Sequence, residues 1–373
     1  MAGMGAQGVA EGSSSSSQWK FPTSALLVTP SAKTSYIPLD KEMYDRARGI
    51  EFLYRLGASL QLPSTALFTA ATWFHRFYVR FSMEDYHRQD IAAGCIFLAT
   101  KTEECGRKLR DVAKVFHQKI YTSNIDLLTD EDIQSCQDAI LGAEAVLLEA
   151  LCFDFVIDSP HEILVDLIER YAGDDLPLGD SAWCIAHDSY RTVLCLLFDE
   201  RIIAAACFIL AQRFMDGEHS ASLDSRISSS APSSSLPTPP TNKPKSPEAT
   251  RLIVEHYQFN EAELADLAEA LTILIDFYGA QNAITPAPHL RAMGSIQPPV
   301  IPDSRLKLYR ADAFAAAAGV PARPEVHSGI NPSQRTPEST HGSSSPAKPG
   351  WKPVRGEAKD EWSRPIRPRL HFG

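Results

Sequence analysis

Apolar residues recur at helical spacing through most of the first 280 residues of the chain. Between residues 41 and 62 they fall every three or four positions, at Tyr44, Ala47, Ile50, Phe52, Leu53, Leu56 and Leu60. Such spacing places them on one face of a helix. Similar patterns predict helices near residues 64–81, 91–104, 109–120 and 129–151, and Thr129 is a suitable capping residue for the last. These five helices predict one compact all-α bundle.

The stretch 91–104 differs from its neighbours because ten small or apolar residues run without a break before Lys101, Glu103 and Glu104. A helix of such low bulk allows other helices to approach closely from every side. Residues 202–211 repeat its pattern without gaps: Ile203, Ala204, Ala205, Cys207, Leu210 and Ala211 match Ile91, Ala92, Ala93, Cys95, Leu98 and Ala99. The repeat predicts two similar helical domains in tandem.

The second set of helices is predicted at residues 161–171, 181–198, 199–215, 251–257 and 260–278. Ser and Pro dominate residues 217–250, which we interpret as a disordered insertion within the second bundle. Residues 1–18 and 280–373 are likewise predicted to be disordered tails, with a short helix at most near residues 314–318 and a basic end. The expected domains are therefore an N-terminal segment at 19–38 that packs on the first bundle, a first bundle at 39–157 and a second at 158–279.

Composition narrows the classes of function. The 373 residues carry a net charge of −10, which argues against a broad face for duplex DNA, because affinity for phosphates depends mainly on Lys and Arg. None of the seven cysteines stands in a Cys-x-x-Cys motif, so we expect reduced thiols in an intracellular protein. No metal-ligand cluster, cofactor motif in its required context, catalytic triad, membrane span or signal peptide is recognised. The sequence predicts a protein that is not an enzyme.

Charges at the end of the small-residue helix are the strongest candidates for function. Taken alone, Lys101 has an ordinary interpretation as a helix-end salt bridge with Glu104, and Glu144 as a solvated helix charge. The surrounding motif changes that interpretation. Residues 98–104, Leu-Ala-Thr-Lys-Thr-Glu-Glu, are similar to the cyclin-box signature, commonly Leu-Ala-x-Lys-x-Glu-Glu.

Further segments strengthen the resemblance to cyclins. Residues 74–78, Phe-His-Arg-Phe-Tyr, resemble the second-helix motif of the transcriptional cyclins K, T and L. Residues 19–31 and 182–196 are similar to their N-terminal segment and to the second-box helix of cyclin K and its fungal relatives. The resemblance covers roughly residues 19–278 without the insertion. It implies two five-helix cyclin boxes in tandem, the second one interrupted.

By this resemblance, Lys101 and Glu144 grip the backbone of a protein kinase just before its regulatory C helix. Glu104 joins the predicted kinase-binding set, as do Leu148 and Phe155, for which an ordinary core role is an equal alternative. In the second copy Arg213 stands where Lys101 does, but the acidic pair is missing, so only the first box is expected to bind the kinase.

The implied function is that of a nuclear regulatory subunit that activates a transcriptional cyclin-dependent kinase acting on the C-terminal repeat of RNA polymerase II. The implied partners are that kinase, as a heterodimer, and the RNA polymerase II machinery. Two alternatives stay open. One is a DNA-binding factor of the TFIIB type, whose zinc ribbon and basic repeats this sequence lacks. The other is an L-type cyclin linked to splicing, which is expected to carry Arg-Ser repeats that are also missing here.

Overall fold

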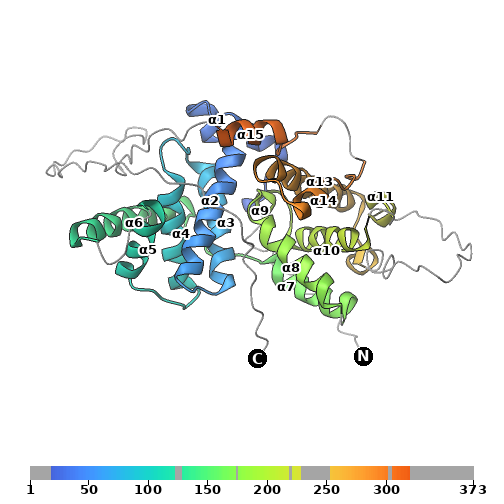
Figure 1. The fold of residues 1–373 in the computed structure, drawn as a ribbon, viewed down its shortest axis with the longest axis horizontal. Coiled ribbons are helices and arrows are strands. Elements are labelled where there is room, and N and C mark those ends of the chain that lie inside the picture. The colour runs from blue at the N-terminus through green and yellow to red at the C-terminus, as the bar shows by residue number, and fades with distance from the viewer. Residues whose placement is uncertain are drawn as a thin grey trace, which may run out of the picture.

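The computed structural model describes residues 18–121, 128–173, 175–217, 221–227, 253–300 and 305–319. Within these ranges the regular elements are all helical, in two bundles that lie side by side (Figure 1). This confirms the predicted fold class of two tandem helical boxes. Of the tails predicted at 1–18 and 280–373, residues 1–17, 301–304 and 320–373 lie outside the described residues, as does most of the predicted insertion.

The first bundle consists of five helices: α2 Leu39–Ser59, α3 Ser64–Arg80, α4 Arg88–Thr102, α5 Leu109–Tyr121 and α6 Asp130–Ala150. Helix α4 is the central one and packs against the other four. Its residues from position 90 to position 100 are all buried. Thr129 caps α6 in a reciprocal capping box with Asp132, which fixes where that helix begins.

In the second bundle, α10 Glu200–Asp216 occupies the position that α4 has in the first, and it packs against α7, α8 and α13. The other elements are α7 Pro160–Leu167, a π-helical turn Ile168–Ala172, α8 Leu176–Ser189, α9 Leu194–Leu197, a helical turn at 253–257 and α13 Glu261–Ile284. The single helix predicted at 181–198 is broken between α8 and α9. There the hydroxyl of Thr192 donates to the carbonyl of Ser189 at 2.5 Å, a local bond that competes with helical pairing.

Two predictions of disorder are wrong in part. Within the predicted insertion, residues 221–227 are ordered and contain α11 Leu223–Ile227, held by an ion pair of 2.6 Å between Arg226 and Asp216. In the predicted tail, α13 continues to Ile284, and α14 Pro288–Gly294 and α15 Ala311–Gly319 follow it. Apolar residues explain this order, because Met293, Leu308, Tyr309 and Phe314 are all buried.

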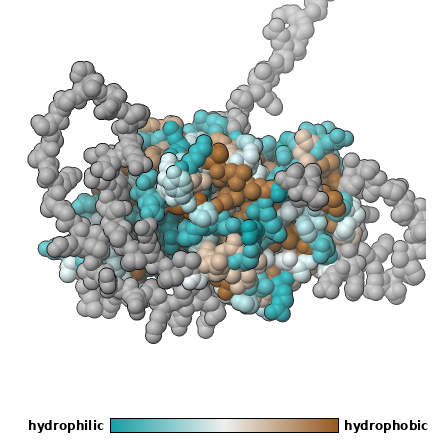
Figure 2. All heavy atoms as spheres, turned by 90° about the horizontal axis from the view of Figure 1, so that it is seen from above, coloured by the Kyte–Doolittle hydropathy of each residue, from teal (hydrophilic) through white to brown (hydrophobic). Residues whose placement is uncertain are grey.

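Residues 305–319, which we call the C-terminal strap, pack against both bundles. The Phe314 ring lies 5.6 Å from that of Tyr44 on α2, and the Tyr309 ring lies 5.4 Å from that of Phe277 on α13. Figure 2 looks onto the side of the molecule where α1 and α15 lie, and shows hydrophobic residues gathered near its middle between hydrophilic margins. The strap thus covers apolar surface of both bundles at once.

The N-terminal segment was expected to pack on the first box, but it contacts both. It contains the 3-10 helix η2 Thr23–Val28 and α1 Pro30–Thr34. The Trp19 indole N–H donates to Asp154 at 3.0 Å, beyond the end of α6. Lys20 pairs with Glu200 at the start of α10 at 2.7 Å.

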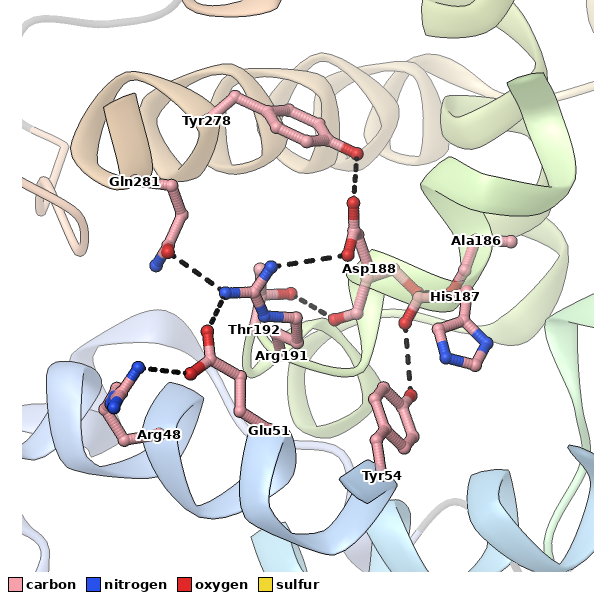
Figure 3. Close-up of polar contacts among 11 residues, drawn as sticks. Arg48, Glu51, Tyr54, Ala186, His187, Asp188, Arg191, Thr192, Tyr278 and Gln281 are labelled. Atoms are coloured by element: carbon pink, nitrogen blue, oxygen red, sulfur yellow. Dashed lines mark hydrogen bonds and ion pairs between the residues drawn. The ribbon is translucent and has the colours of Figure 1, made fainter. Parts of the chain in front are cut away.

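A polar junction joins the two bundles where α2, α8 and α13 meet (Figure 3). The Arg191 guanidinium forms an ion pair with Glu51 of the first bundle and donates to Gln281 of the second at 3.0 Å. It also contacts Asp188, which accepts a hydrogen bond from Tyr278 at 3.0 Å. One side chain therefore connects three helices from both boxes.

Candidate functional site

The position of Lys101 depends on how closely α4 and α6 approach each other. Gly94 lies on α4 where a Cβ atom would stand only 2.9 Å from that of Ala143 on α6 and 3.2 Å from the backbone nitrogen of Glu144. Only a glycine permits so close an approach. Lys101 lies about two turns further along α4, in its last turn, and reaches the same part of α6.

Lys101 and Glu144 form an ion pair across these two helices. The Lys101 Nζ atom lies 2.6 Å and 2.8 Å from the two carboxylate oxygens of Glu144, and 4.1 Å from the centre of the Phe97 ring. The Lys101 side chain is 48% exposed, whereas that of Glu144 is 10% exposed. Neither ordinary interpretation from the sequence is correct, because Lys101 pairs with Glu144 and not with Glu104.

This pairing leaves hydrogen-bonding capacity for a partner. An ammonium group has three N–H donors, and a carboxylate has about four lone-pair sites. Because Lys101 is half exposed, it retains a donor toward solvent. A peptide backbone that offers a carbonyl oxygen and an amide could therefore bind both residues without the ion pair being broken.

Glu103 and Glu104 lie at the end of α4 but face different surroundings. Glu103 accepts a hydrogen bond of 2.8 Å from the Thr69 hydroxyl on α3. Glu104 is exposed and has a φ of +52°, the left-handed conformation that often ends a helix but is unfavourable for a side chain with Cβ. Glu104 follows Lys101 by three residues in the sequence, but the ion pair of Lys101 is with Glu144.

Leu148 is half-buried on α6, on the same helix face as two more exposed residues. Leu141 and Ala145 precede it at spacings of seven and three residues, and the Leu141 side chain is 43% exposed. The face of α6 that runs past Glu144 is therefore partly apolar and open to solvent.

Phe155 is half-buried, with its ring centre 5.7 Å from that of Trp73 in the first bundle. Phe153 was missed by the sequence analysis, although it is 65% exposed and sits at a φ of +58° just after α6. The alternation of aromatic residues at 153 and 155 after a charged helix was the signal that could have found it. Together these rings extend the apolar surface beyond the end of α6.

The corresponding positions of the second bundle are arranged differently. Arg213, which aligns with Lys101, donates to the carbonyl of Gly217 at the end of its own helix α10. This bond satisfies a carbonyl at the C-terminus of α10. Among the described residues, no group of three or more His, Cys, Asp or Glu side chains is placed to hold a metal ion. No described helix is long and apolar enough to span a bilayer.

Comparison with known proteins gives consistent results. Residues 26–156 match the family model of the cyclin N-terminal domain. The chain is 44% identical over 206 residues to Cyclin pch1 of Schizosaccharomyces pombe, an alignment that covers 54% of this chain and 60% of the relative. It is 33% identical over 202 residues to Cyclin-T1-4 of Arabidopsis thaliana, covering 53% of this chain and 37% of the relative. The chain thus spans only part of the length of these relatives.

The fold resembles a chain of the yeast RNA polymerase II CTD kinase CTDK-1 complex, with a TM-score of 0.53 and 17% sequence identity. That likeness covers 80% of this chain and 81% of the other. It extends over both bundles, whereas the family model covers only the first. Residues 26–156 thus form a cyclin N-terminal domain, and the relatives to which the chain is similar are themselves cyclins.

Proposed function

We propose that this chain is the regulatory subunit of a transcriptional cyclin-dependent kinase, and that it binds the kinase through the surface around Lys101 and Glu144. The observation that carries the proposal is the half-exposed ion pair between these residues, bordered by the apolar face of α6. Similarity to Cyclin pch1 and Cyclin-T1-4 supports the transcriptional type. Glu104, Leu148 and Phe155 complete the proposed contact surface.

Binding of this kind activates a kinase by positioning one of its elements. A protein kinase needs a Glu of its C helix to pair with the strand Lys that holds the ATP phosphates. A partner that binds only the conformation with the helix in place shifts the kinase toward that conformation by its difference in affinity. The rigid packing of α4 against α6 suits this role, because the surface does not have to be ordered on binding.

The proposed substrate of the activated kinase is the C-terminal repeat of RNA polymerase II. The chain itself is proposed to act in the nucleus as a non-catalytic subunit that promotes transcription elongation. The likeness of fold to a chain of a CTD kinase complex supports this substrate. Direct binding to duplex DNA is not part of the proposal, since the net charge of −10 disfavours it.

Candidate kinases are first recovered by pull-down with this chain and identified by mass spectrometry. Each purified kinase is then mixed with the purified chain, and phosphate transfer to a polymerase repeat peptide is measured. We expect wild type to activate one of them strongly and Lys101→Glu to lose at least about 100-fold in affinity, because two charge-assisted hydrogen bonds are worth roughly 1.5–3 kcal/mol each. Lys33→Glu, an exposed change of the same charge on α1, serves as the matched control.

A charge swap separates contact from folding. The double variant Lys101→Glu with Glu144→Lys restores an ion pair across α4 and α6 but reverses its polarity. We expect its stability to stay near that of wild type while kinase binding is lost. If the swapped protein still bound and activated the kinase, the ion pair would be only structural and the proposed contact would be refuted.

A further inference from the structure

A second surface feature lies between the two boxes, at the starts of α3 and α7. It is an open cleft of about 220 Å³, smaller than the roughly 300–1,000 Å³ typical of small-molecule pockets. Phe68, His161 and Trp183 form its aromatic wall, and the His161 ring stacks on Phe68 at 3.8 Å with an interplanar angle of 12°. Its size suits one long side chain of a partner.

His161 gives the first indication of a ligand. The residue is only 4% exposed, and neither ring nitrogen has a hydrogen-bond partner among the described residues. A buried polar group without a partner costs about 1–3 kcal/mol, so such groups call for an explanation. Both nitrogens are covered, so a group bound in the adjoining cleft supplies the missing hydrogen bond once the ring has turned toward it.

The charge of the cleft gives the second indication. Glu103 and Glu162 line it, no Lys or Arg does, and no cationic partner is recorded for either carboxylate among the described residues. Glu162 is exposed, and Glu103 uses one oxygen to accept from Thr69. Two carboxylates beside aromatic faces favour a cation, which gains from ion pairing and from the ring quadrupoles. A phosphate or carboxylate group would be repelled.

The third indication favours a peptide over a free cation. Ser64 and Thr65 line the same cleft at the first turn of α3, whose preceding residue Pro63 offers no capping side chain. The backbone N–H groups of this first turn are therefore not capped, and they can donate to carbonyl oxygens. An extended backbone supplies such carbonyls beside its side chain.

We propose that this inter-box cleft binds an extended peptide segment of a partner protein by one Arg or Lys side chain. The cationic end pairs with Glu103 and Glu162 and donates to a ring nitrogen of His161. The aliphatic part of the side chain lies against Trp183, and a peptide carbonyl lies at the start of α3. The cleft is separate from the ion pair of Lys101 and Glu144, so the proposal does not depend on the kinase-binding role of that pair.

The test uses the full chain without any kinase. The probes are acetyl-Ala-Ala-Arg-Ala-Ala-amide with a neutral fluorophore, the same peptide with Gln or Glu in place of Arg, and free arginine amide. We expect saturable binding of the Arg peptide by fluorescence anisotropy, with affinity lower by about ten-fold or more for the Gln peptide. Arginine amide should compete more weakly than the peptide, because it lacks the flanking carbonyls.

Variants locate the binding. Glu162→Gln and Glu103→Gln should each lower the affinity for the Arg peptide by several fold. His161→Phe, which keeps an aromatic ring but loses the ring nitrogens, should also lower this affinity. Glu169→Gln, an exposed change outside the cleft, should leave the affinity unchanged. The proposal is overturned if the Arg peptide does not bind, if the Gln peptide binds equally well, or if both cleft variants behave like the control. Equal affinity for free arginine amide would overturn the peptide part of it.

Discussion

At the scale of single residues, His75 shows how the packing between the boxes sets a protonation state. It is fully buried on α3, and its Nε2 atom lies 2.7 Å from the carbonyl oxygen of Tyr190 in the second box. Burial, aided by the positive charge of Arg46, lowers the pKa of His75 to about 3, although the bond to Tyr190 opposes the shift. The ring is therefore neutral at physiological pH and donates one hydrogen bond between the boxes.

This predicts acid sensitivity with a defined sign. The unfolded His75 binds a proton near pH 6.5, whereas the folded residue does so only near pH 3. The free energy of unfolding should therefore fall as pH drops from about 6.5 toward 3, by up to about 1.4 kcal/mol per pH unit for this residue. Burial also lowers the pKa of His161 to about 3, so that residue adds a similar slope.

Urea unfolding between pH 7 and pH 4 measures this effect. His75→Asn retains a hydrogen-bond donor but cannot bind the proton. We expect it to reduce the slope of the free energy of unfolding against pH by the contribution of about one proton, roughly 1.4 kcal/mol per pH unit. Ala316→Ser, an exposed change on α15 that removes no titrating group, serves as the control and should leave the slope unaltered. A slope in His75→Asn identical to that of wild type would show that the folded His75 is not kept neutral.

Sequence reasoning identified the ion-pair residues but not their arrangement. The resemblance selected Lys101 and Glu144, and the structure brings them within 2.6 Å of each other. Their pairing could not be read from local spacing, because it joins two helices whose residues lie 43 positions apart. The kinase-binding role of these residues stays a prediction. Phe153 was missed because its exposure depends on how the chain leaves α6.

At the scale of elements, the contact between α4 and α6 depends on Gly94. We expect Gly94→Ala to destabilise the first box by up to about 2 kcal/mol. The new Cβ would meet Ala143 and backbone atoms of α6 that cannot move independently, at a cost of about 1–3 kcal/mol. The gain in helix propensity, roughly 1 kcal/mol, does not offset the larger values. Displacement of α6 should also weaken kinase binding.

Gly279→Ala on α13 is the matched control, because a Cβ at that position meets no atom within 4 Å. The same change should there raise the free energy of unfolding by about 0.5–1 kcal/mol. Chemical denaturation of both variants checks the prediction. A stabilised Gly94→Ala protein would mean that α4 and α6 are not in close contact.

Most helices could be predicted because their apolar residues recur over three or more turns, as in α2 and α5. Helix α4 was recognised instead by its unbroken run of small and apolar residues. The prediction failed where composition was given more weight than a few apolar anchors. Residues 280–319 are rich in Pro and Ala, yet Met293, Tyr309 and Phe314 attach them to the core. Such anchors gain their effect from tertiary packing, which local periodicity does not report.

At the scale of the whole molecule, the two boxes are joined by the Arg191 junction, the N-terminal segment and the C-terminal strap. The strap consists of residues that the sequence analysis assigned to a disordered tail. The Val193 N–H donates to the Tyr309 hydroxyl at 3.2 Å, so the strap also pairs with the backbone between α8 and α9. These contacts should make the two boxes unfold as one cooperative unit.

Removing the strap's main anchor tests this view. Phe314 is fully buried, so we expect Phe314→Ala to lower the free energy of unfolding by about 3–5 kcal/mol. Ala316→Ser, an exposed change on the same helix, should have little effect. Urea denaturation followed by circular dichroism measures both. Equal stability of Phe314→Ala and wild type would show that residues 305–319 do not contribute to the folded core.

The strap also affects how the protein is made. A chain emerges from the ribosome N-terminus first, so Tyr44 and the neighbouring surface of α2 leave the exit tunnel long before Phe314 is synthesised. During that interval this apolar surface stays open to water and to chaperones. We expect the nascent first box to reach its final stability only after residue 319 has been released from the tunnel.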